Sequence, residues 1–339
     1  MNTAEPLFLM APMAGVTDPA FRARLRRWGC RALATEMVSA AALARGNRRT
    51  LSYLQAPDRG RDLTLQVFGA DPDELARAGE RVYEAGYPWL DFNMGCPVKK
   101  VVRSGAGAAL LADPERARRC LVALRRAFPG RLSVKIRSGW DAGSVNCLEV
   151  GKMAEDCGVD RVTLHPRTRA QGYAGKADWS WVARLVREVS VPVAGNGDVA
   201  SGPEAAARLR RTGCAAVMIG RGALGAPWVF RDAEAAWRGA PAPPPPEAPR
   251  IGLDLLRQID DLARWKGERA AVVEMRKFLA WGAKGMGGAT EFRREIQQCD
   301  SRDRLEAAVR RFFRVGEEER TERGVRGRRA TGGPVATVE

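Results

Sequence analysis

The strongest chemical signal in this sequence is a cysteine at position 96, within the run Asn-Met-Gly-Cys-Pro at residues 93–97. Residues 89–92 read as an apolar strand, and the Gly-Cys-Pro turn that follows lifts the thiol out of the packed core. An unperturbed thiol has a pKa of about 8.5, so Cys96 is mostly protonated at neutral pH and can donate a proton. A cysteine is more often a small buried apolar residue, and the turn sets Cys96 apart from that alternative.

The elements that would position this cysteine alternate between strands and helices. Short apolar runs typical of buried parallel strands fall at residues 7–13, 32–38, 63–69, 89–95, 132–137, 161–166, 191–197 and 215–221. Amphipathic segments lie between most of them, at 72–85, 114–128, 179–189 and 203–212, and three of these open with Asp-Pro or Gly-Pro. Eight strand–helix units favour a TIM (β/α)8 barrel over an open doubly wound sheet.

In such a barrel the chemistry lies at the carboxyl ends of the strands. The residues at those ends are Pro12, Met13, Ala14, Gln66, Asn93, Cys96, Lys135, His165, Arg167, Asn196, Gly197, Asp198, Gly220 and Arg221. Barrels often hold a phosphate on backbone N–H groups after the seventh and eighth strands. Each glycine-rich segment, 195–198 or 220–222, could alone be an ordinary turn. Together they favour a phosphorylated cofactor over the barrel mouth.

Two further residues have both a chemical and a structural interpretation. Lys135 alternates with buried neighbours in the apolar run 132–136, so it either points into the barrel mouth or pairs with a carboxylate. In the mouth its charge would stabilise negative charge on a bound cofactor. His165 is the only histidine and leaves the sixth strand, where it either contacts cofactor or substrate or is a packed, hydrogen-bonded core residue.

Composition points to a partner and a compartment. The formal net charge is +16, which predicts a polyanionic partner, most commonly nucleic acid. The alternative, an arginine-rich surface from a GC-rich genome, explains arginine over lysine but not the excess of charge. No apolar run approaches the roughly 18 residues of a membrane span and no secretion signal opens the chain, so we expect a cytoplasmic protein without membrane contact. Seven scattered cysteines and one histidine predict reduced thiols and no metal site.

The chain divides at a proline-rich stretch. Residues 238–249 form a stiff linker between a barrel at 1–237 and a small all-α domain at 250–315, with helices expected at 251–265, 270–284 and 302–313. Residues 316–339 are dominated by glycine and charge, which predicts a basic, disordered tail.

Taken in order, these motifs resemble the tRNA-dihydrouridine synthases, flavin enzymes that reduce specific uridines in tRNA. The resemblance covers nearly the whole folded chain, with its bacterial B branch nearest from residues 220–230. It rests on residues 11–18, Gln66, 93–97, 134–137, 165–168, 196–198 and 220–225 in the barrel, and on 275–281 and 283–285 beyond the linker. Gly282 departs from the pattern, because an aromatic residue is expected there.

The resemblance implies a role for each strand-end residue. Reduced FMN would give a hydride to C6 of uracil, and Cys96 would give a proton to C5, with NADPH or NADH re-reducing the flavin. The FMN would be lined by Pro12, Met13 and Ala14, contacted at its ring by Gln66, Lys135 and His165, and held at its ribityl-phosphate end by Asn196, Gly197, Asp198, Gly220 and Arg221. The substrate-binding residues would be Asn93 and Arg167 at the flipped-out uracil and Lys99 and Lys100 at the tRNA phosphates. We expect a monomer.

Two other interpretations compete with this one. An FMN-dependent barrel oxidoreductase acting on a free pyrimidine shares the phosphate site but needs neither the helical domain nor the net charge. An RNA-binding protein that has lost catalysis needs both, but has no use for Cys96 and Lys135.

Overall fold

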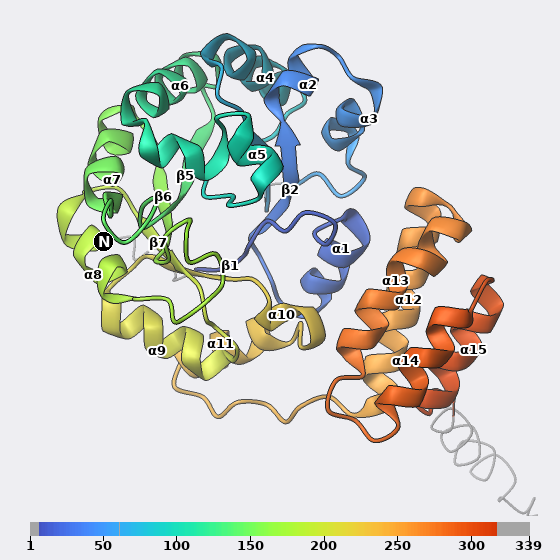
Figure 1. Cartoon of the computed structure of the whole chain (residues 1–339). Helices are drawn as coiled ribbons and strands as arrows, with labels where there is room; N and C mark the ends of the chain where they lie inside the picture. Colours follow the sequence, from blue (N-terminus) through green and yellow to red (C-terminus); the bar gives the residue numbers. More distant parts are fainter. Residues whose placement is uncertain (1–6, 61, 317–339) are drawn as a thin grey trace, which may run out of the picture. The chain divides into compact units, whose positions relative to one another are not determined.

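The computed structural model describes residues 7–60 and 62–316. Eight parallel strands form one sheet in the order β1-β8-β7-β6-β5-β4-β3-β2, so that β1 and β2 stand at its two ends. The ring closes beside β1, where the Met10 N–H donates to the Ala32 carbonyl at 2.8 Å and Leu9 bridges Ala32. The expected TIM barrel is confirmed (Figure 1). Its strands are β1 (Leu7–Met10), β2 (Leu33–Ser39), β3 (Leu63–Phe68), β4 (Trp89–Met94), β5 (Arg131–Arg137), β6 (Arg161–His165), β7 (Val193–Asn196) and β8 (Ala216–Ile219).

Helices surround the strands on the outside of the barrel (Figure 1). The α-helices of this unit are α1 (Pro19–Arg27), α2 (Ala40–Ala44), α3 (Arg48–Leu51), α4 (Pro72–Glu84), α5 (Lys99–Arg103), α6 (Pro114–Ala127), α7 (Cys147–Asp156), α8 (Ser180–Glu188), α9 (Gly202–Thr212), α10 (Gly222–Gly225) and α11 (Val229–Trp237). Two 3-10 helices, η1 (Ser52–Gln55) and η2 (Gly107–Ala112), lie in the loops.

The helix starts follow from their capping residues. The Asp71 carboxylate accepts from the Glu74 N–H at 2.9 Å before α4, and Asp113 does the same for the Arg116 N–H at 3.1 Å before α6. Helix α9 begins at the expected Gly-Pro pair, with Gly202 and Pro203 as its first two residues and the Ser201 side chain as its cap.

Three strands, β1, β7 and β8, are each three residues shorter than the sequence predicted. The expected strand at 7–13 ends at Met10, because the Met13 carbonyl accepts from the N–H groups of Val16 and Thr17 and so bends the chain into a turn. The expected strand at 191–197 begins at Val193, after a proline that has no N–H to give to a ladder.

The inside of the barrel has an apolar side and a polar side. Leu9, Ala11, Ala194, Ala216 and Met218 pack together between β1, β7 and β8. On β3, β4 and β5 the residues that hydrogen bond with one another across the strands are instead polar: Gln66, Asp91, Asn93 and Ser133. Polar groups inside a barrel need partners, and these four satisfy one another.

The described chain divides into two compact units between Pro243 and Pro244. The second unit contains α12 (Ala248–Lys266), α13 (Glu268–Gly282), α14 (Ala289–Gln298) and α15 (Arg302–Phe312), packed through buried Leu255, Phe278 and Phe292. Helix α14 was not expected, because only Phe292 and Ile296 supply it with large buried apolar side chains. Apart from Gly316, the predicted tail at 316–339 lies outside the described residues.

Candidate functional site

The turn after β4 holds Cys96 by its backbone. The Asn93 side-chain oxygen accepts from the N–H groups of Gly95, at 3.1 Å, and Cys96, at 2.9 Å. The Cys96 carbonyl in turn accepts from the Ala108 N–H at 3.1 Å. Gly107 permits this approach, because a Cβ there would lie 2.9 Å from the Cys96 carbonyl oxygen. Cys96 is half-buried, and the other six cysteines are buried.

The surroundings of Cys96 keep its thiol protonated. Burial raises the pKa of Cys96, while a hydrogen bond with the Val98 backbone and the charges of Arg137 and Lys135 pull that pKa down without reversing the shift. Both cations come from β5. Lys99 and Lys100 are exposed on α5 and are not among the groups that shift the Cys96 pKa. A thiol in this setting is a proton donor rather than a nucleophile at neutral pH.

Gln66 and Asn93 are joined to a buried carboxylate. The Asn93 amide donates to the Gln66 side-chain oxygen at 2.9 Å, and the Gln66 amide donates to Asp91 at 2.7 Å. Ser133 donates to the other Asp91 oxygen at 2.5 Å. Burial raises the pKa of Asp91, which is 5% exposed.

Lys135 lies between Asn93 and Thr163 in the strand register. Burial, together with the charge of Arg137, lowers the pKa of Lys135 to about 8, and Asp91 opposes this shift. No carboxylate of the described residues forms an ion pair with Lys135 within 4 Å. The alternative in which Lys135 forms a structural ion pair is therefore not found among the described residues. The charge of Lys135 gives the barrel mouth a positive potential.

His165 is neutral and its tautomer follows from a neighbour. Burial, with the charges of Lys135, Arg137, Arg167 and Arg221, lowers the pKa of His165 to about 2. The Arg167 guanidinium lies 3.4 Å from Nε2 of His165. Because arginine can only donate, Nε2 accepts and the proton resides on Nδ1. His165 can thus offer a neutral N–H donor toward a ligand.

Asp198 organises the end of β7. Its carboxylate pairs with Arg167 at 2.7 Å, accepts from the Ala177 N–H at 2.7 Å, and lies 3.9 Å from Arg221. These cations and the Ala177 N–H lower the Asp198 pKa against the effect of burial. Asp198 therefore faces protein donors and holds Arg167 and the loop at Ala177 in place.

The turns after β7 and β8 fit a phosphate group. Gly197 and Asp198 have positive φ, at 112° and 50°. Gly222 lets the two turns approach, since a Cβ there would lie 2.3 Å from the Val199 carbonyl oxygen. Within residues 7–60 and 62–316, no acceptor takes the backbone N–H groups of Gly197, Asp198, Arg221 or Gly222. Free N–H groups beside arginines suit the phosphate of a cofactor such as FMN.

The remaining expected cofactor residues follow β1. Pro12 and Met13 are half-buried and Ala14 is exposed. A Cβ built on Gly220 would have only Ala11 and the Met13 sulfur, at 3.9 Å, as near neighbours. The protein's own packing therefore leaves room beside Gly220. The Asn196 amide donates to the Met218 carbonyl at 2.8 Å, so it fastens β7 to β8.

Sequence reasoning missed three residues around these groups. Asp91 and Arg137 each lie two positions from an expected site residue of the same strand, and period-two alternation would have found them. Arg137 donates to the carbonyls of Gly95, Thr168 and Gly172. Tyr173 is 62% exposed and lies beneath the guanidinium groups of Arg137 and Arg221. No local signal marks it, because its arginine neighbours come from the end of β5 and from the loop after β8.

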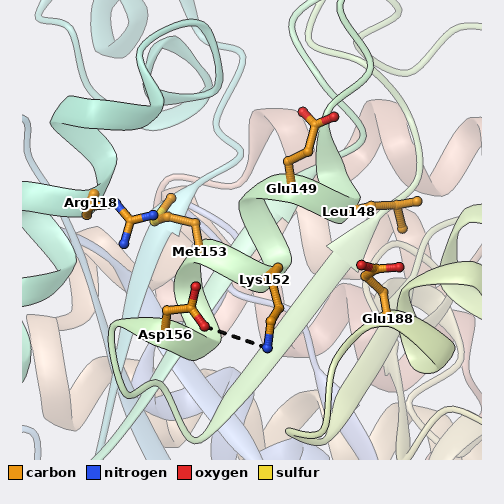
Figure 2. A pocket seen from close by; sticks show the side chains of 7 residues that line it. All are labelled: Arg118, Leu148, Glu149, Lys152, Met153, Asp156 and Glu188. Atoms are coloured by element: carbon orange, nitrogen blue, oxygen red, sulfur yellow. Dashed lines mark ion pairs between the residues drawn. The ribbon is translucent and has the colours of Figure 1, made fainter.

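A cavity of about 440 Å³ lies away from these groups, among the outer helices. Figure 2 shows its lining of Arg118, Leu148, Glu149, Lys152, Met153, Asp156 and Glu188, from α6, α7 and α8. It contains none of the expected site residues. Its lysine is paired with Asp156 at 3.6 Å and with Glu155 at 2.6 Å, as on an ordinary solvated surface.

Two kinds of feature are absent from the described residues. They contain no group of three or more His, Cys, Asp or Glu side chains placed to hold a metal ion. None of their helices is long and apolar enough to span a membrane.

The fold is that of a barrel protein with a separate helical unit, and comparison with known proteins gives its family. A family model described as "Dihydrouridine synthase (Dus)" matches residues 9–315. The tRNA-dihydrouridine synthase B of Pseudomonas aeruginosa is 37% identical, over 90% of this chain and 92% of its own length. A probable tRNA-dihydrouridine synthase 1 of Synechocystis is 36% identical, over 91% and 87%. A probable tRNA-dihydrouridine synthase of Mycobacterium tuberculosis is 36% identical, over 99% and 89%. The chain belongs to the dihydrouridine synthase family, which confirms the resemblance and the expectation of an enzyme.

Proposed function

We propose that this protein reduces uridines in tRNA to 5,6-dihydrouridine, using FMN and taking electrons from NADPH. The observation that carries the proposal is Cys96, the one half-buried thiol of the chain, with its pKa raised at a barrel mouth that is otherwise cationic. The relatives are named tRNA-dihydrouridine synthases, which supports tRNA as the substrate.

The residues at the strand ends fit FMN. When bound and reduced, FMN supplies a hydride to C6 of the uracil. The Lys135 charge and the Nδ1–H of His165 would face its ring beside Gln66, and positive potential there stabilises a reduced, anionic flavin. The free N–H groups of the turns at 197–198 and 221–222 would take its phosphate. Pro12, Met13 and Ala14 would cover one side of the cofactor.

Cys96 would act as the general acid. Its proton would pass to C5 of the uracil, and the thiolate left behind would be stabilised by Lys135 and Arg137, the two cations that act on its pKa. The uracil would be flipped out of the tRNA and oriented by Asn93 and Arg167. Lys99 and Lys100, both exposed on α5, would meet the tRNA phosphates.

The helical unit at 250–315 would bind the rest of the tRNA. Exposed basic side chains occur on all four of its helices, and they are Arg250, Arg257, Arg264, Lys266, Arg269, Arg293, Arg294, Arg304, Arg310 and Arg311. Phosphate contacts of this kind make affinity fall steeply with salt. A cytoplasmic monomer would suffice for this activity.

The test is direct. Purified protein should be yellow and release FMN, and with NADPH it should form dihydrouridine in tRNA that lacks this modification, measured by mass spectrometry of the nucleosides. Free uridine should be reduced much more slowly, because it lacks the phosphates that the basic surface recognises. Absence of dihydrouridine in the tRNA, or equal rates with free uridine, would contradict the proposal.

A further inference from the structure

A buried chain of hydrogen bonds leads from β5 to the turn that carries Cys96. Ser133 donates to one oxygen of Asp91 at 2.5 Å, and Gln66 donates to the other at 2.7 Å. Asn93 donates to Gln66 at 2.9 Å, and the Asn93 oxygen accepts the Cys96 N–H at 2.9 Å. Gln66, Asp91 and Asn93 are 1%, 5% and 7% exposed. Water therefore has little access to the bonds that join Ser133, Asp91, Gln66 and Asn93, and the last bond, to Cys96, is partly buried.

The groups at the two ends of this row of hydrogen bonds decide which way each bond in it donates. The two ends of a carboxamide have nearly the same shape but opposite hydrogen-bonding character. At one end, the Asp91 oxygen that faces Gln66 accepts, so Gln66 must present its NH₂ there and its oxygen to Asn93. At the other end, the backbone N–H of Cys96 can only donate, so Asn93 must present its oxygen there. Reversing either amide would set donor against donor inside the protein, at a cost of about 1–3 kcal/mol per unsatisfied group.

The geometry points to Asp91 as a positioning residue for the proton donor. We propose that Asp91, acting through Gln66 and Asn93, orients the Asn93 amide and so holds the Cys96 turn in its productive place. This inference rests on the proposed function, in which Cys96 protonates the substrate. Asp91 itself touches neither Cys96 nor any group proposed to react.

A competing explanation is that Asp91 matters only as a buried negative charge. Arg161 and Lys135 both act electrostatically on Asp91 and both pull its pKa down. Asparagine separates the two explanations. Its oxygen can accept from Gln66 while its NH₂ donates to Ser133, whose hydroxyl can accept as well as donate. Asp91→Asn thus removes the charge and keeps the direction of the chain, whereas Asp91→Leu removes both.

The experiment compares wild type, Asp91→Asn, Asp91→Leu, Ser133→Ala and Cys96→Ala as full-length, FMN-loaded proteins. Ser133→Ala is the matched control, since it removes a bond of the same buried network that does not lie between Asp91 and Cys96. One readout is the rate at which tRNA reoxidises the NADPH-reduced flavin in a single turnover. The second is the rate of flavin reduction by NADPH, in which Cys96 takes no part. The third is the rate of Cys96 alkylation by iodoacetamide in flavin-free protein.

Asp91→Leu should slow reoxidation about thirtyfold, a barrier change of about 2 kcal/mol, while NADPH reduction stays within about threefold of wild type. Cys96 alkylation should become several times faster, because the released turn exposes the thiol. Asp91→Asn and Ser133→Ala should stay within about threefold of wild type in all three rates. Loss in Asp91→Asn equal to that in Asp91→Leu, equal loss in Ser133→Ala, or normal reoxidation in Asp91→Leu would each overturn the proposal.

Should Asp91→Leu fail to fold, Gln66→Leu cuts the same chain one link nearer to Cys96 and leaves the carboxylate in place. Its flavin-free form should show the same faster alkylation of Cys96, and unchanged alkylation would overturn the proposal. Cys96→Ala keeps the two claims apart. Normal reoxidation in Cys96→Ala would remove the acid role itself, whereas slow reoxidation in Cys96→Ala with normal reoxidation in Asp91→Leu would remove only the positioning role.

Discussion

The side-chain oxygen of Asn93 lies 2.9 Å from the backbone nitrogen of Cys96, and the two residues are separated by three positions of the chain. With the bond from the Gly95 N–H to the same oxygen, this contact ties the turn that carries the thiol to the end of β4. Burial raises the pKa of the thiol and outweighs Arg137 and Lys135, the two cations that favour its thiolate.

The first prediction concerns the ionisation of Cys96. Because burial raises the pKa of Cys96, its alkylation by iodoacetamide should rise with pH along a curve whose midpoint lies above that of a free thiol, near 8.5. The other six cysteines are buried and should not react in the folded protein. Mass spectrometry of the labelled peptide measures the curve, with Cys96→Ser as the control. A midpoint below 8 would show that Cys96 ionises more easily than a free thiol, which would contradict both the raised pKa and the acid role.

The second prediction uses the single histidine. The pKa of His165 is lowered to about 2, far below its ordinary 6.5, so the imidazole should not titrate between pH 5 and 8. The lowered pKa of His165 also makes the stability of the fold depend on pH. The unfolded chain takes up a proton on His165 below pH 6.5 and the folded chain does not, so this residue lowers the stability as the pH falls. An NMR titration of untagged protein, with its one histidine ring, gives the answer. A midpoint near 6.5 would refute the neutral assignment.

The strands of this molecule could be predicted from its sequence, but the contacts within the candidate site could not. All eight strands were predicted, because a buried parallel strand is a nearly continuous apolar run in the sequence. The residues that follow these strands were then the residues of the candidate site. The contacts among those residues could not be predicted. Whether Asp198 meets a ligand or Arg167, and whether His165 is charged, depends on loops that meet only when the barrel closes. Helix α14 was not predicted, because its sequence lacks a clear apolar pattern: Phe292 and Ile296 are its only large buried apolar side chains.

The third prediction sets stability against function at Lys135. The folded pKa of Lys135 is about 8 and its unfolded value about 10.5, so the buried charge costs stability below pH 8 and the cost disappears as the pH rises through this interval. Lys135→Met should therefore stabilise the flavin-free protein by about 1–3 kcal/mol at pH 7 and by less at pH 10. Chemical denaturation at both pH values measures the difference.

Lys152→Met is the matched control for Lys135→Met. Lys152 is an exposed surface lysine on α7, and its replacement should change the stability by no more than about 0.5 kcal/mol. Destabilisation by Lys135→Met at pH 7 would mean that Lys135 has a structural partner after all.

The fourth prediction concerns the glycine beneath His165. Gly197 has φ 112°, and a Cβ there would lie 2.8 Å from Cδ2 of His165. Gly197→Ala should therefore displace the imidazole and weaken FMN binding at least about tenfold, as well as destabilise the fold. Gly86→Ala is the control, because Gly86 has φ 78° but no atom within 4 Å of its Cβ position. Gly86→Ala should lose only the folding stability that an alanine at positive φ costs, and it should bind flavin with normal affinity. Equal flavin affinity in the two variants would exclude a role for Gly197 at the cofactor.

The central claim is that the Cys96 thiol protonates the substrate, and one single-turnover experiment tests it. Wild-type and Cys96→Ala enzymes, both loaded with FMN and reduced with NADPH, are mixed with tRNA that lacks dihydrouridine, and the return of the flavin absorbance is followed. Loss of a positioned general acid should slow reoxidation in Cys96→Ala by about a hundredfold or more, with flavin binding and NADPH reduction unchanged. Reoxidation of Cys96→Ala within a few-fold of wild type would contradict the account.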